Sequence, residues 1–99
     1  MTDIGKVAQL KQLLFGLEKD LGIADLSEIQ QNILYAASLL AVGDKPVETD
    51  DIRNHQLLAT AARSTFFKAL RELVASGYLQ HMSGAQRSQY LLTDKFKGQ

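Results

Sequence analysis

Basic and hydroxyl side chains recur along one stretch of the chain, residues 60–76, at the spacing of an amphipathic helix. Phe66, Leu70, Leu73 and Val74 fall on its apolar face. The other face and the first turns carry Arg63, Ser64, Thr65, Phe67, Lys68 and Arg71. Guanidinium and ammonium groups bind phosphate oxygens, and arginine, lysine and short hydroxyl side chains also form hydrogen bonds with base edges. These six residues are therefore candidates for contact with double-stranded DNA.

A β-hairpin is expected directly after this helix, because two segments rich in strand-favouring residues, 78–83 and 88–92, flank a glycine-containing turn. Leu79 and Leu92 are expected to point inward. The tip, residues 83–89, is a candidate contact with the DNA backbone or minor groove, since an arginine suits a narrow groove electrostatically. Its candidate contact residues are Gln86, Arg87 and Gln89.

Phe67 is the exception on the polar face, since a large apolar ring is not expected where a helix meets a DNA groove. Three interpretations are open: the ring packs under the hairpin, touches a thymine methyl group, or belongs to a protein-binding surface. We favour packing under the hairpin. The last interpretation supports an alternative function, a protein-interaction module that does not bind DNA.

The formal net charge is zero, which by itself argues against a nucleic-acid partner. The charges are nevertheless segregated along the chain. Residues 1–51 contain nine acids and four lysines, whereas residues 52–90 contain five bases and one acid, Glu72. Positive charge is thus concentrated in the segment that holds the candidate helix and hairpin, as phosphate contact requires.

Three further helices are expected before residue 60. The first spans about residues 3–20, where apolar residues follow helical periodicity. The second begins at Ser27, whose spacing from Gln30 predicts a capping box. The third is short, with Thr49 as its expected N-cap. Thr60 is expected to cap the helix with the DNA-contact candidates, which completes a helix-turn-helix unit.

The first helix carries an apolar stripe at alternating spacings of three and four residues. Its members are Val7, Leu10, Leu14, Leu17 and Leu21. The stripe lasts only about two heptads, so two interpretations stay open, packing onto the chain's own core and self-association. Gly16 weakens the helix by roughly 1 kcal/mol relative to alanine, a cost that a closely crossing helix would compensate. We expect a homodimer that uses this stripe.

Several sequence segments within residues 26–98 resemble winged helix-turn-helix regulators of the MarR-like kind. They are Leu26-Ser27-Glu28-Ile29-Gln30, Arg63-Ser64-Thr65, the stretch from Leu70 to Leu79, and the closing Leu92-Thr93 with Gly98. The resemblance implies a small transcriptional regulator. In such proteins the helix matching residues 60–76 enters the major groove, and the wing arginine, here Arg87, reaches the minor groove or the backbone.

Three features depart from the family pattern. The link between Ile52 and Arg63 is roughly three residues longer than the tight turn typical of the family. Ala85 occupies the place of an aspartate that usually precedes the wing arginine by two residues. The sequence stops where the family's long C-terminal dimerisation helix would begin, so we expect the N-terminal helix to take that role.

The length of 99 residues suits one domain, which would span residues 1–99. We expect a mainly α fold with a small β-hairpin, that is, an α+β winged helix-turn-helix. Its expected parts are a dimerisation helix at 1–21, a helical core at 26–76 and the wing at 77–93. No apolar run reaches the roughly 20 residues of a membrane span, and the N-terminus does not resemble a secretory signal. We therefore expect a cytoplasmic protein without a membrane partner.

Neither a cofactor, a metal site nor an enzymatic activity is expected. The chain has no cysteine, and His55 and His81 lack the spacing of a helical metal pair, so both are interpreted as structural. Asp50 and Asp51 follow Thr49 as helix-start residues rather than as paired catalytic carboxylates. No nucleophile, base and orienting group occur together. The sequence does not indicate an effector ligand or an operator.

Overall fold

A computed structural model gives the fold of the chain and describes residues 3–41, 43, 45–81 and 89–93. In chain order the elements are α1 (Ile4–Leu21), α2 (Glu28–Leu40), β1 (Val47–Glu48), α3 (Thr49–Arg53), the 3-10 helix η1 (Gln56–Leu58), α4 (Arg63–Ala75), β2 (Leu79–His81) and β3 (Gln89–Leu92). Two compact units result, one with α1 and the turn up to Leu26, and one that begins at Ser27. None of the helices in the described ranges combines the length and the apolar character of a membrane span.

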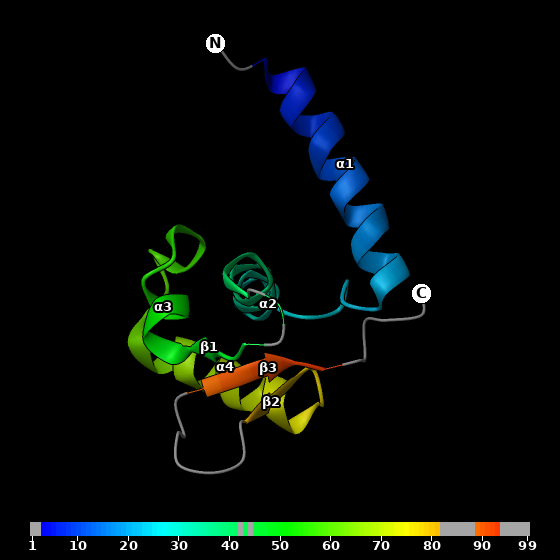
Figure 1. The fold of residues 1–99 in the computed structure, drawn as a ribbon. Coiled ribbons are helices and arrows are strands. Elements are labelled where there is room, and N and C mark those ends of the chain that lie inside the picture. Colours follow the sequence, from blue (N-terminus) through cyan, green and yellow to red (C-terminus); the bar gives the residue numbers. More distant parts are fainter. Residues whose placement is uncertain (1–2, 42, 44, 82–88, 94–99) are drawn as a thin grey trace. The chain divides into compact units, whose positions relative to one another are not determined.

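Helix α1, the blue helix of Figure 1, is capped at both ends by local hydrogen bonds. The Asp3 carboxylate accepts the Gly5 amide at its N-terminus. At its C-terminus Gly22 has a φ of 79°, and the Ile23 amide donates to the Glu18 carbonyl. The expected helix over residues 3–20 is confirmed to within one residue at each end.

Helices α2 and α4 have equally recognisable ends. The Ser27 hydroxyl accepts the Gln30 amide, and the Gln30 side chain accepts the Ser27 amide, so the predicted capping box is confirmed. After α4, Gly77 adopts a φ of 88°, and the Tyr78 amide donates to the Leu73 carbonyl. This turn directs the chain from α4 into β2.

The predicted hairpin is confirmed as the antiparallel pair β2 and β3, with Leu79 opposite Leu92 and His81 opposite Tyr90. Leu79 is buried as expected, whereas Leu92 is only half-buried. A third strand, β1, pairs with β3 and was not predicted. The strand order is therefore β1-β3-β2, all antiparallel.

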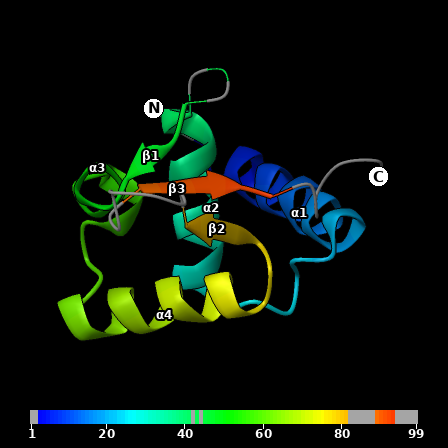
Figure 2. The same cartoon turned by 60° about the horizontal axis from the view of Figure 1, so that its bottom comes forward.

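Nearly all of the buried apolar side chains belong to the unit that begins at Ser27; among the described residues, Ile23 is the one that lies in the other unit. Helix α2 packs against α3, η1 and α4, while α4 also lies next to β2 (Figure 2). The largest fully buried side chains of this unit are Ile33, Ile52, Phe66, Leu70, Leu73 and Leu79. A mainly helical chain with a small antiparallel sheet in this order is compatible with a winged-helix-like arrangement.

Two expected N-caps are wrong, one by one residue and the other by two. Thr49 is the first residue of α3 rather than its cap, which is Glu48. Helix α4 begins at Arg63, and its cap is Ala62 rather than Thr60. The reason is η1, where the Ala61 amide still donates to the Leu58 carbonyl and so keeps residues 59–61 in the turn.

Candidate nucleic-acid interface

The outer face of α4 carries three exposed polar side chains at helical spacing, Ser64, Lys68 and Arg71. They lie opposite the buried face of α4, which packs into the core through Phe66 and Leu73. Burial of the apolar face therefore fixes the direction in which this polar row points. An exposed row with two cations and a hydroxyl can bind phosphate oxygens and base edges.

Phe67 on α4 contacts two arginines, one on α3 and one on α4. Its half-buried ring packs edge-on against Phe66, with the centroids 5.1 Å apart. The guanidinium carbon of Arg63 lies 5.2 Å from the Phe67 centroid, and that of Arg53, the last residue of α3, lies 5.7 Å from it. Both distances are within the range of cation–π attraction. We call Arg53, Arg63 and Phe67 the arginine–phenylalanine cluster.

The cluster accounts for the aromatic ring that was unexpected on a polar helix face. Packing against Phe66 and attraction to two guanidinium groups are structural reasons for Phe67 to occupy its position. The favoured prediction, packing under the hairpin, stays a prediction, because residues 82–88 of the hairpin lie outside the described part of the chain. The alternatives of a thymine contact and a protein contact stay predictions.

Arg53 was missed as a candidate contact by the sequence reasoning. Arg53 belongs to the positively charged segment of the chain but lies outside the helix over 60–76 and the hairpin, which hold the predicted contacts. A usable signal was its place at the end of the first helix of the helix-turn-helix unit, since that helix crosses the backbone in such motifs.

The one acid of α4, Glu72, lies on the flank of the helix that faces α2. The side-chain amide of Gln30 donates to the Glu72 carboxylate at 3.3 Å. Thr65, seven residues before Glu72, shares this flank and lies away from Phe67. Thr65 is exposed, yet it is not gathered with the arginine–phenylalanine cluster.

The hairpin candidates divide between described and undescribed residues. Gln89 is the first residue of β3, and its side-chain amide donates to the Glu48 carboxylate on β1 at 2.7 Å. This bond ties Gln89 to the sheet beside an acid rather than presenting it at a tip. Gln86 and Arg87, the other two candidates, lie outside the described residues.

Buried Tyr90 anchors β3 to α3. Burial raises the pKa of the Tyr90 hydroxyl, and a side-chain hydrogen bond with Thr49 partly opposes the rise. The His81 ring lies against the Tyr90 ring, with the centroids 4.6 Å apart and the planes tilted by 38°. His55 also has a structural place, because its Nδ1 atom accepts the Leu57 amide at the start of η1. Thr49 and both histidines thus hold the local fold that positions α3 and α4.

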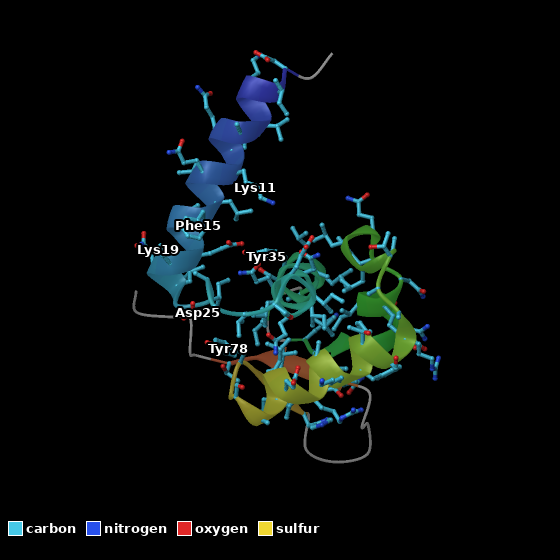
Figure 3. The ribbon with its side chains drawn as sticks, turned by 180° about the vertical axis from the view of Figure 1, so that it is seen from behind. Lys11, Phe15, Lys19, Asp25, Tyr35 and Tyr78 are labelled. Atoms are coloured by element: carbon cyan, nitrogen blue, oxygen red, sulfur yellow. The ribbon has the colours of Figure 1, made fainter. Side chains whose placement is uncertain are left out.

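The proposed dimerisation stripe of α1 is exposed. Val7, Leu10, Leu14 and Leu17 are 43, 66, 40 and 51% exposed, and Leu21 is half-buried. On a different side of the helix the Lys19 ammonium lies over the Phe15 ring, 5.9 Å from its centroid (Figure 3).

Comparison of the chain with known protein families, with curated protein sequences and with solved structures found no match.

Proposed function

We propose that this chain binds double-stranded DNA as a small winged helix-turn-helix transcriptional regulator of the MarR-like kind, with α4 in the major groove. The observation that carries the proposal is the arginine–phenylalanine cluster. In it the Phe67 ring attracts Arg53 from α3 and Arg63 from α4, the two helices of the helix-turn-helix. Ser64, Lys68 and Arg71 extend the same polar surface along α4. Arg53 then contacts the phosphate backbone, while Arg63 and Lys68 approach base edges.

The start of α4 adds a second source of affinity for phosphate. Its cap residue, Ala62, has no side-chain acceptor for the first amides of the helix. Amides at a helix N-terminus attract anions, and Arg63 begins that turn. The amides at this helix end therefore add to the attraction between Arg53 and the phosphate backbone.

The wing is proposed to complete the contact through Arg87 and Gln86, with residues 83–89 on the backbone or in the minor groove. A dimer through α1 would bring two copies of α4 to successive major grooves, about one helical turn apart. Because the net charge is zero, binding depends on the local cations and should fall steeply with salt.

The second candidate function is a protein-interaction module that does not bind DNA. The zero net charge and the half-buried Phe67 ring favour it. The two functions predict opposite behaviour with a DNA duplex, so one assay separates them.

The test is fluorescence anisotropy with mixed-sequence duplexes at low salt, followed by a salt titration. Arg53→Ala and Arg63→Ala should each weaken binding severalfold, since the first removes a phosphate contact and the second removes a contact with a base edge. Lys45→Ala is the matched control, because it removes an exposed cation before β1, outside α3 and α4. Absence of binding at about 100 micromolar protein, the weak end of non-specific affinities, would overturn the proposal in favour of the interaction module.

A further inference from the structure

The apolar stripe of α1 has the spacing of a coiled-coil seam and an exposed surface. Its leucines and valine alternate at three and four residues over the length of an 18-residue helix. Leu10 is two-thirds exposed, and Leu14 and Leu17 are exposed as well. An exposed seam of this kind loses apolar area from water when a second helix packs on it.

Charged residues border the seam on both sides. One border consists of Lys6, Leu13 and Asp20, and the other consists of Ile4, Lys11 and Glu18. Glu18 is already buried within the chain. The exposed charges that determine whether a second helix binds parallel or antiparallel are therefore Lys6, Lys11 and Asp20.

A parallel pair of α1 helices places like charges together. In that arrangement each border meets the opposite border of the second helix about five residues further on. Lys6 then faces Lys11 of the second copy, and symmetry repeats this contact. Two lysine–lysine contacts oppose the parallel arrangement.

An antiparallel pair brings each border against the same border of the second copy. With Val7 packed against Leu17 and Leu10 packed against Leu14 of the second copy, four layers of the seam are filled.

In this register the charges favour association. Lys6 faces Asp20 of the second copy twice by symmetry, and Leu13 meets Leu13 near the two-fold axis. One like-charge contact arises, between the two Lys11 side chains on the other border. These long side chains can extend into water while their stems stay on the seam. Two attractive pairs against one repulsive pair select the antiparallel over the parallel arrangement.

We propose that α1 pairs with α1 of a second copy of this chain as an antiparallel two-helix coiled coil, with Lys6 of each copy facing Asp20 of the other. The proposal rests on the dimer that forms part of the proposed function and defines its geometry. Because the seam has only four layers, association is weak and depends on protein concentration.

The charge test is sedimentation equilibrium of the full chain without DNA, at hundreds of micromolar. Lys6→Glu should weaken association roughly tenfold, because both Lys6–Asp20 pairs change from attraction to repulsion. Lys6→Glu with Asp20→Lys should restore wild-type association. A parallel pair predicts the opposite for the single variant, since the introduced carboxylate would then attract Lys11 of the second copy. Stronger association of Lys6→Glu would therefore overturn the proposal.

Single cysteines provide a second test, because the chain has none of its own. Leu13→Cys should form a disulfide-linked dimer on mild oxidation, since the two positions meet near the axis. Val7→Cys should not, because Val7 faces Leu17 of the second copy. The reverse pattern would indicate a parallel pair and overturn the proposal.

Leu14→Asp should abolish association while the helical circular dichroism is retained, because Leu14 is exposed in the single chain. A wild-type chain that stays monomeric at hundreds of micromolar would also overturn the proposal. No DNA is present in these assays, so a failure of DNA binding in the anisotropy experiment leaves their outcome unaffected.

Discussion

Helices α1 and α4 are both amphipathic, but α4 buries its apolar face whereas α1 leaves its apolar face exposed. Both end at a glycine with positive φ, and in both a cation lies over a phenylalanine ring. Helix α4 buries Phe66, Leu70 and Leu73, whereas the only residue of α1 that is buried is Glu18. Periodicity therefore predicts each helix and its apolar face, while burial depends on what the rest of the chain brings to that face.

The two cation–π contacts show the same difference. Lys19 and Phe15 are four residues apart on one helix, so their contact stabilises only α1. Phe67 instead holds Arg53 from α3 as well as Arg63 from α4. A contact between helices fixes their relative position, which a contact within one helix does not.

The largest expected effect comes from the same substitution in the two helices. Leu73→Ala should lower the free energy of unfolding by about 2–5 kcal/mol, because Leu73 is fully buried and leaves a cavity. Leu10→Ala should change it by less than about 0.5 kcal/mol in the monomer, since Leu10 is 66% exposed. Urea unfolding of dilute protein measures both.

A large loss of monomer stability for Leu10→Ala would mean that the α1 stripe is part of the chain's own core. This would remove the contrast between the helices and the basis for self-association. Repeating the measurement at high protein concentration separates the two cases, because a dimer makes the midpoint depend on concentration.

The next effect concerns DNA affinity. Phe67→Leu keeps an apolar side chain but removes the ring that holds Arg53 and Arg63, so affinity for duplex DNA should fall up to about tenfold. Phe15→Leu is the matched control, since it removes an equivalent ring from α1, and it should leave affinity unchanged. Equal effects of both substitutions would show that the cluster has no special part in binding. Anisotropy at fixed salt measures them.

Local features of the fold could be predicted from the sequence because their signals are local. The Ser27 and Gln30 capping box needs only residues three apart, and Gly77 marks the end of α4 by its backbone conformation alone. The hairpin was also predictable from two strand-favouring segments around a turn. Amphipathic spacing indicated which face of α4 would be buried.

Features that depend on distant residues could not be predicted. Strand β1 has two residues and exists because Val47 and Glu48 pair with β3, more than forty positions away. The start of α4 moved because η1 holds the preceding turn in hydrogen bonds. Arg53 entered the candidate site only when Phe67 brought it beside Arg63. Each of these needs a tertiary contact that no short window of sequence contains.

Alanine substitution of glycine should have opposite signs in the two units. Gly16→Ala should stabilise α1 by about 1 kcal/mol, because Gly16 lies in the helix interior and nothing comes within 4 Å of an added Cβ. Gly16 shares the polar face of Gln9 and Gln12, away from the seam, so self-association should persist. Gly77→Ala should cost about 1 kcal/mol, since its φ of 88° strains any other residue. Thermal unfolding followed by circular dichroism measures both.

Loss of self-association in Gly16→Ala would indicate that a partner helix crosses at Gly16, the arrangement that would compensate the cost of a glycine in the helix. The seam of Leu10 and Leu14 would then not be the contact surface. Sedimentation of this variant beside wild type decides between the two surfaces.

The smallest expected effect is a pH-dependent one, confined to the unit that buries Tyr90. Tyr90→Phe removes the hydrogen bond with Thr49 and should cost about 0.5–1 kcal/mol near neutral pH. Burial raises the pKa of Tyr90 above its ordinary value of 10.0, so the folded state holds the phenol proton more tightly than the unfolded chain. This contribution is fully present below about pH 10 and is lost as pH rises through the folded pKa. Wild type should therefore lose more stability than Tyr90→Phe above about pH 10, and the two urea-unfolding curves should converge. Curves that stay parallel would mean that the Tyr90 hydroxyl is not desolvated against α3, and that β3 is held there by its apolar contacts alone.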